Sequence, residues 1–367
     1  MLSSLLPWML ISQLSATCAE TCADQCVADA VAPVQGEIAM LQQRHHSHTR
    51  QQPELLKHAA AAPHQVSLPA LLDLALGRKN IWPGEKKPKI QPIQDIELSK
   101  VDLAVKKPQR VAVFAQAANL DLLPHLQQCI TNVGAAQGNI GSTVDVYLST
   151  PRARPDEIPH IKESVKQATP ALGMLEVQIT QNKGADIGQL LQQMQQAPHR
   201  VYDTILKIHT KSSHAIRDDI LHQLCGSAEI AQKIIASFAA NPALGLAGAD
   251  GWLAWKGMPR GTPHFDGCLW DPNEQKNMKK IWSLLSPGTP MPPKDAWAAA
   301  VSSFWWSRGS SVTSNPVLLA AAPRILDIMQ WGYRRDSVGR PEHALERLIA
   351  TMVRAEGAVL ARIRRED

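Results

Sequence analysis

Two short polar segments combine residue types that could bind an anionic ligand. Each follows an apolar run of strand type, and their candidate residues are Asn182, Lys183, Asp186, His209, Thr210 and Lys211. The two lysines could neutralise a diphosphate, and an aspartate at the start of a helix could orient a ligand. Each residue also has an ordinary explanation, because Asn suits a turn, Asp caps helices and a lysine beyond a strand is usually solvated. The residue types alone leave both interpretations open.

The alternation of strands and helices around these segments predicts that they meet. Apolar runs of strand type lie at 111–114, 144–148, 175–179, 204–208 and 244–247, and helical spacing is found at 120–133, 158–168, 187–194, 216–225 and 228–240. This alternation predicts an α/β fold, with a mostly parallel sheet and helices on both faces. Ligands bind such sheets at the carboxyl ends of the strands. We therefore expect Asp250, which follows the last of these strands, to join the two polar segments.

The remaining chain is less regular. Further helices are predicted at 276–285, 317–329 and 342–355, and a further strand at 301–306. Cys129 and Cys225 lie in apolar helical patterns, where a cysteine usually acts as a small buried hydrophobe. No zinc-type cysteine spacing is present, and we predict neither a disulfide framework nor a catalytic cysteine.

Three regions divide the chain. Residues 1–19 are apolar and uncharged, which is typical of a signal peptide or a short anchor; an apolar tail is the alternative, because no basic residue precedes the run and Pro7 interrupts it. Residues 20–108, rich in Ala, Gln, Pro and Lys, predict a low-order stalk or linker. Residues 109–367 form the predicted α/β domain. The expected location is the secretory pathway lumen or a membrane surface reached through the N-terminus.

Composition and missing motifs narrow the function. The 367 residues are 44% hydrophobic and 19% charged, as in a globular protein. The net charge of +5 suits an anionic small ligand, fits a solvated surface equally well, and is too weak to indicate nucleic acid. The sequence contains no dinucleotide fingerprint, P-loop, H-E-x-x-H or G-x-S-x-G motif. Dehydrogenase, P-loop, zinc-protease and hydrolase functions are therefore disfavoured.

Four ordered blocks resemble a known family. They are N-K-G-A-D-I-G (182–188), Y-D-T-I-L-K-I-H-T-K-S-S (202–213), a block from L-C-G-S-A-E-I to G-L-A-G-A-D-G (224–251) and P-E-H-A-L-E-R-L (341–348). Together they resemble the rhamnan synthesis protein F family over about residues 110–367. The resemblance implies a nucleotide-diphospho-sugar transferase (GT-A-like) fold. It also implies transfer of rhamnose or a related deoxyhexose from a nucleoside diphosphate donor to a growing cell-surface polysaccharide or glycan.

The resemblance also assigns the two polar segments to the donor. In such folds an Asp-x-Asp at a strand end normally holds a divalent metal on the diphosphate. This sequence has no Asp-x-Asp, and His209, Thr210 and Lys211 occupy that place. Fixed cations can replace a metal, so we predict no metal ligands and no firm cofactor, although a divalent metal is compatible with the fold. A catalytically inactive sugar-nucleotide or glycan-binding module on the same fold is the alternative.

The catalytic base of such an enzyme must be a carboxylate or histidine near the acceptor hydroxyl. The candidates are Asp250, at the end of its strand, and Glu342 and Glu346, which lie one helical turn apart. The alternative for Glu346 is an ordinary surface helix in which it pairs with a neighbouring arginine. The expected partners are a nucleoside-diphospho-sugar and a glycan acceptor.

Overall fold

The computed structural model describes residues 90–103, 108–196, 201–255, 271–332 and 339–364. All of them belong to the unit Val66–Asp367. The expectations for residues 1–19 and for most of the predicted stalk therefore lie outside the described residues. None of the helices in the described ranges has both the length and the hydropathy that a membrane span needs.

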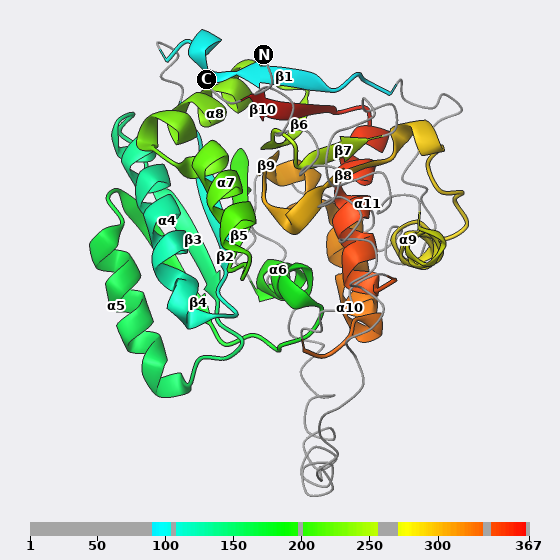
Figure 1. Cartoon of the computed structure of the whole chain (residues 1–367), viewed down its shortest axis with the longest axis horizontal. Coiled ribbons are helices and arrows are strands. Elements are labelled where there is room, and N and C mark those ends of the chain that lie inside the picture. The colour runs from blue at the N-terminus through cyan, green and yellow to red at the C-terminus, as the bar shows by residue number, and fades with distance from the viewer. Residues whose placement is uncertain (1–89, 104–107, 197–200, 256–270, 333–338, 365–367) are drawn as a thin grey trace, which may run out of the picture. The chain divides into compact units, whose positions relative to one another are not determined.

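Within these ranges the chain forms an eight-stranded mixed sheet (Figure 1). Its strands are β1 (Gln94–Glu97), β2 (Val111–Gln116), β3 (Val144–Ser149), β4 (Leu172–Gln178), β5 (Thr204–His209), β6 (Leu244–Ala249), β9 (Trp305–Arg308) and β10 (Val359–Arg364). Their spatial order is β1-β10-β6-β9-β5-β2-β3-β4. Neighbouring strands are parallel, except that β9 runs antiparallel to both β5 and β6. The predicted α/β fold with a mostly parallel sheet is confirmed.

Helices cover both faces of this sheet, and each face has its own apolar cluster (Figure 1). One face carries α4 (Leu123–Gly138), α5 (Ile158–Ala168), α7 (His214–Cys225) and α8 (Ala228–Ala240), and the other carries α6 (Ala185–Gln196), α9 (Pro272–Leu285), α10 (Pro316–Ile328) and α11 (Pro341–Ala355). Side chains alternate between the faces along a strand. In β5, Leu206 and Ile208 therefore join the first cluster and Ile205 the second, which places Lys207 and His209 on the α6 face.

Two strand predictions need correction. The stretch Gln94–Glu97 falls in the predicted stalk, yet it forms β1 and pairs with β10 at the edge of the sheet. Only Ile96 of this strand is buried, so no apolar run revealed it. The strand expected at 301–306 starts later, at Trp305, because Ser302 and Ser303 have positive φ angles of 69° and 59° and form a turn. Just before that turn, β8 (Ala298–Ala300) pairs with β7 (Leu253–Trp255).

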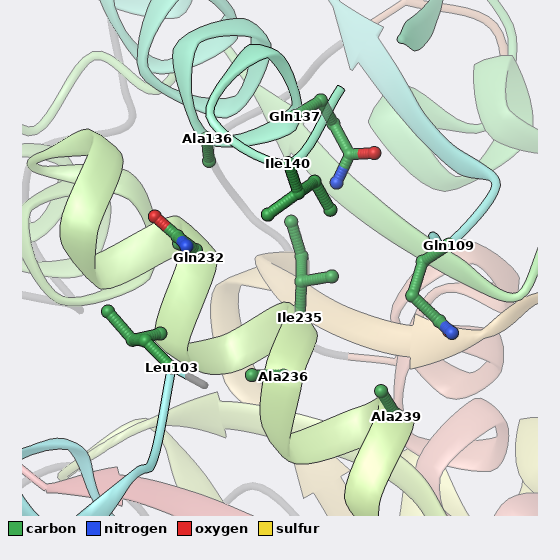
Figure 2. Close-up of a pocket in the computed structure, with 9 residues that line it drawn as sticks. All are labelled: Leu103, Gln109, Ala136, Gln137, Ile140, Gln232, Ile235, Ala236 and Ala239. Atoms are coloured by element: carbon green, nitrogen blue, oxygen red, sulfur yellow. The ribbon is translucent and has the colours of Figure 1, made fainter. Parts of the chain in front are cut away.

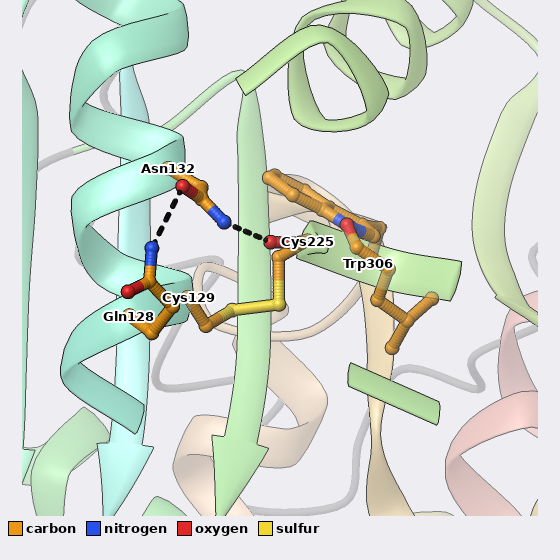
Figure 3. The surroundings of a disulfide bond; sticks show 6 residues. Gln128, Cys129, Asn132, Cys225 and Trp306 are labelled. Carbon is orange, nitrogen blue, oxygen red and sulfur yellow. Dashed lines mark hydrogen bonds between the residues drawn. A yellow bond between two sulfur atoms is a disulfide. The ribbon is translucent and has the colours of Figure 1, made fainter. Parts of the chain in front are cut away.

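The expectation for the cysteines was also wrong. Cys129 of α4 and Cys225 of α7 are buried, but they form a disulfide between residues 96 positions apart (Figure 3). The amide of Asn132 donates to the carbonyl of Cys225 over 2.7 Å, and the indole of Trp306 donates to the carbonyl of Leu224 over 3.0 Å. These contacts fix the C-terminal end of α7. Apolar spacing around each cysteine could not reveal its partner, because the pairing depends on how α4 and α7 pack.

Candidate active site

A buried row of polar side chains crosses the carboxyl edge of the sheet on the α6 face. Ser149, Gln116 and His209 occupy matching register positions on three adjacent strands. The Gln116 amide donates to Oε1 of Gln193 over 2.7 Å, and the Ser149 hydroxyl donates to Oε1 of Gln189 over 3.0 Å. Both acceptors belong to α6. These hydrogen bonds therefore hold α6 over the ends of β2 and β3.

An ion pair between α6 and β5 lies at the centre of this site. Lys207 is fully buried, and its ammonium donates to Oδ2 of Asp186. The Asp186 side chain keeps 20% of its surface exposed. A buried charge needs a partner to offset the loss of its hydration. Lys207 was missed by the sequence reasoning, although a lone lysine inside the apolar run of 204–208 was a usable signal.

The loop before α6 explains why Asp186 sits where it does. Gly184 has a φ of +71°, and a Cβ added there would lie 2.9 Å from Cα of Gly188 and clash with the sulfur of Met329. Its amide donates to the carbonyl of Gln330 over 2.8 Å, and the Gly332 amide donates to the Asn182 carbonyl over 2.7 Å. The glycine thus permits a close contact between this loop and the chain beyond α10. That contact fixes the start of α6 above Lys207.

The charges in the site set the protonation of Asp186 and Lys207. Burial by itself raises the pKa of the Asp186 carboxyl, but His209, the Lys207 ammonium with its hydrogen bond, and Lys211 together hold that pKa well below its usual range. Burial lowers the pKa of the Lys207 ammonium, and Asp186 and Glu346 oppose this effect. Asp186 is therefore an anion at neutral pH and a weak proton acceptor.

His209 is held neutral and in one orientation. Burial, with the nearby charges of Lys207 and Lys211, lowers its pKa to about 4, although Asp186 opposes the shift. Its Nε2 lies 2.8 Å from the carbonyl oxygen of Ser302. Its Nδ1 lies 3.2 Å from the Thr210 carbonyl oxygen, and because a carbonyl only accepts hydrogen bonds, we assign the proton of the neutral ring to Nε2, which makes the shorter contact. The left-handed turn at Ser302 aims this carbonyl at the histidine, so the turn contributes to the site.

Two further charged side chains approach the ion pair. Lys211, two residues beyond the end of β5, is half-buried, and its charge acts on Asp186, Lys207 and His209. Glu346 of α11 is also half-buried, and its charge acts on Lys207. Within the described ranges neither side chain forms a salt bridge. Both are therefore suited to contact a substrate.

The other predicted donor-binding residues point elsewhere. The Lys183 ammonium lies 5.7 Å from the ring centre of Trp331 and 3.4 Å from the carbonyl of Asp327, beside the end of α10. The Thr210 hydroxyl accepts from the amide of Asn119 over 3.1 Å and so links the chain after β5 to the chain after β2. Asn182 contributes its backbone carbonyl to the loop contact. The structure thus brings together Asp186, His209 and Lys211, with the other three at the margin.

Two of the three predicted catalytic carboxylates are engaged in ion pairs. Asp250 lies 3.3 Å from Arg364 and 3.8 Å from Arg362, both on β10. In the order of the sheet β9 separates β6 from β5, and β10, which carries both arginines, lies on the far side of β6. Glu342 is 2% exposed, with its carboxylate 3.6 Å from Arg340. Of the three, Glu346 is the one whose charge acts on Lys207.

Within the described ranges, neither a metal-ligand cluster nor the cavity between α4 and α8 offers a second candidate. No group of three or more His, Cys, Asp or Glu side chains in the described ranges is arranged to hold a metal ion. Figure 2 shows a cavity of about 10 Å³ between α4 and α8, lined by apolar side chains and by Gln109, Gln137 and Gln232. Among the described residues, the Gln137 amide has no hydrogen-bond partner. A cavity of this size holds at most one water molecule, so it belongs to the packing of the opposite face.

Comparisons with known proteins agree with three of the four blocks identified in the sequence; the fourth, at 341–348, lies outside the matched range. Residues 87–311 match the family model described as rhamnan synthesis protein F. In the search of curated proteins, none matches this chain. The matched range holds the Asp186 loop, the Lys207–Lys211 strand end and the Ser302 turn, and it spans more than half of the sequence. The chain belongs to the rhamnan synthesis protein F family.

Proposed function

We propose that this protein is a glycosyltransferase that moves rhamnose or a related deoxyhexose from a nucleoside diphosphate donor to a growing cell-surface polysaccharide or glycan. Family membership supports a role in rhamnan synthesis. The observation that carries the proposal is the meeting of Asp186, His209 and Lys211 at the carboxyl edge of a mostly parallel sheet, where such folds bind their ligands. The fold we propose is of the nucleotide-diphospho-sugar transferase (GT-A-like) type.

Charge assigns the parts of the donor to different residues. Lys211 has no salt bridge within the described ranges, so its ammonium is suited to the diphosphate. Asp186 is an anion and repels phosphate, so it is not assigned to the diphosphate. His209 is neutral, so it lines the donor site as a polar ring and adds no charge to it. In this proposal the fixed cation of Lys211 takes the place of a metal on the leaving group.

Glu346 is the base of the proposed reaction. A base must take a proton readily, which Asp186 cannot do because neighbouring cations stabilise its anion. Glu346 removes the proton of the acceptor hydroxyl as that oxygen bonds to the anomeric carbon. The bond from that carbon to the diphosphate breaks in the same step, and the leaving diphosphate faces Lys211. Glu342 and Asp250 remain in their ion pairs.

One observation favours a second function. Two of the three candidate bases are committed to arginines, as expected of a fold that has kept ligand binding and lost catalysis. The alternative is therefore an inactive module that binds a sugar nucleotide or glycan. Binding of a donor without any turnover, over a broad set of acceptors, distinguishes this function from the first.

We also propose that the protein works in the secretory pathway lumen or at a membrane. The Cys129–Cys225 disulfide supports an oxidising compartment. The apolar, uncharged residues 1–19 support export or anchoring. Sequencing the N-terminus of the mature protein tests whether this segment is removed.

The test of the proposed function is donor turnover by the full chain and by Lys211→Met. Loss of the cation that faces the diphosphate should lower kcat/KM by about 10²- to 10³-fold. Lys162→Met, which changes an exposed lysine of α5, should have no effect, and a chelator should have none either. Full activity of Lys211→Met would contradict the assigned site, and loss of activity in chelator would contradict the fixed-cation account.

A further inference from the structure

A lysine lies inside the apolar part of β5 without access to water. Lys207 is 0% exposed, and its register neighbours on the two adjacent strands are Phe114 and Trp305. All three side chains face α6, so the lysine stem is flanked by aromatic rings. An ion in such surroundings loses its hydration, and only a well-placed opposite charge offsets that loss. A methionine would fill the same volume without the loss of hydration energy. A lysine at this position therefore indicates a role for its charge.

The partner of this lysine is held asymmetrically. The Lys207 ammonium binds Oδ2 of Asp186, and Nε2 of His209 lies 3.9 Å from the same oxygen. Oδ1 has no hydrogen bond to any residue in the described ranges, while the side chain is 20% exposed. One oxygen is thus fixed by the core, and the other is left for a group that arrives from solvent.

We propose that Lys207 is a positioning residue, which holds Asp186 as an anion and presents its Oδ1 to a hydroxyl of the donor sugar. This inference rests on the proposed function. It assigns the sugar, and not the diphosphate, to the Lys207–Asp186 pair. A fixed carboxylate oxygen accepts from a sugar hydroxyl without first losing water or changing its rotamer.

The charged groups around Asp186 make the role testable through pH. Lys207 and His209 approach it from β5 and Lys211 from the following segment, while the charge of Glu346 on α11 acts on Lys207. In the native chain the Asp186 pKa is depressed, so its contribution to stability is present above the unfolded value of about 4 and is lost below it. Without Lys207, only His209 and Lys211 oppose the effect of burial on the Asp186 carboxyl, so we expect its pKa to rise above the unfolded value. The buried, unpaired Asp186 anion would then destabilise the folded variant at neutral pH, and this destabilisation would decrease as the carboxylate takes up a proton at lower pH.

The first arm of the experiment measures urea unfolding of the full chain at pH 7 and at pH 5. The Lys207→Met variant should be strongly destabilised at pH 7 and should regain part of the loss at pH 5. Lys207→Met/Asp186→Asn, which removes both charges, should recover stability at pH 7 and show no such regain. Lys166→Met on α5 is the matched control, because that lysine is exposed. Equal pH dependence of wild type and Lys207→Met would overturn the charge coupling.

The second arm measures binding of UDP, dTDP and GDP, and of their rhamnose conjugates, by calorimetry. Wild type should bind one conjugate more tightly than its bare diphosphate. The stable double variant should lose at least tenfold of this sugar-dependent affinity and keep its affinity for the bare diphosphate. Retention of the sugar-dependent affinity would overturn the inference alone. Failure of wild type to bind any of these compounds would overturn the proposed function, and the inference with it.

Discussion

At the scale of residues, the site separates charges that cancel from charges that remain available. Lys207 and Asp186 neutralise one another inside the protein, and His209 is uncharged near neutral pH. Lys211 and Glu346 are left at the margin with opposite charges and half-buried side chains. This division fits a reaction in which an anion leaves on one side while a proton is removed on the other. The pair at the centre sets geometry, and the two outer groups act on the substrate.

The base assignment predicts the effect of Glu346→Gln. This change keeps the shape of the side chain and removes its ability to take a proton, so kcat should fall by about 10²- to 10⁴-fold with little change in donor affinity. Steady-state transfer assays and calorimetry measure the two quantities. Glu163→Gln on α5 is the matched control, since that glutamate is exposed. An unchanged kcat would show that another residue is the base. A loss of donor affinity would show that Glu346 binds the donor.

The sequence could reveal a site residue only where its role follows from the order of strands and helices, and not where it depends on a partner distant in the chain. Asp186, His209 and Lys211 were recognisable because strand ends of a parallel sheet converge. Lys207 was not recognisable, because a single lysine inside an apolar run does not change the prediction of a buried strand. Asp250 and Glu342 were ranked with Glu346 because the arginines that engage them became visible only in the folded chain. Local spacing cannot show that Arg364 of the last strand reaches Asp250.

At the scale of elements, α7 connects the disulfide to the donor site. Its C-terminal residue Cys225 is bonded to α4, and near its N-terminal end Arg217 donates to the Lys211 carbonyl over 3.2 Å. The indole of Trp306 ties the same helix to β9, a neighbour of β5. The disulfide therefore anchors the helix that follows the strand end carrying Lys211. The order of strands and helices was predictable, but this cross-link was not, because it joins helices that the chain order leaves far apart.

Removing the cross-link should lower stability. Cys129→Ala/Cys225→Ala should cost about 3–5 kcal/mol, because a loop of 96 residues is no longer closed in the unfolded chain. The measurement is denaturant unfolding without reductant. Dithiothreitol should shift the wild-type midpoint toward that of the variant and leave the variant unchanged. Titration of two free thiols at these positions in the native, air-oxidised protein would contradict the cross-link.

At the scale of the whole molecule, the site lies at the seam between two parts of the sheet. Strands β2 to β5 form one part, and β6, β10 and β1 form the other, with antiparallel β9 between them. The chain leaves β5 through α7 and α8, skips one strand position, and returns later to fill it with β9. The residues after β5 also stand beside the point where the strand order reverses, because the chain runs from β2 to β3 and β4 and then places β5 on the other side of β2. Open sheets bind ligands at such a switch point.

The other edge of this sheet sets where the folded domain begins. The boundary at residue 109, which composition indicated, cuts off β1, whereas the family match starts at residue 87. Strand β1 pairs with β10, Asp95 binds Arg362 over 2.8 Å and 3.0 Å, and Ile96 and Leu98 are buried.

A chain shortened to 109–367 should therefore have a free energy of unfolding lower by several kcal/mol, at about 1.5–3 kcal/mol for each buried side chain. It should also expose the edge of β10 to association with other chains. A chain of 87–367 should unfold at the same denaturant concentration as the full protein, and Ile96→Ser in the full chain should give part of the loss. Equal unfolding midpoints for 87–367 and 109–367 would show that β1 is dispensable to the sheet.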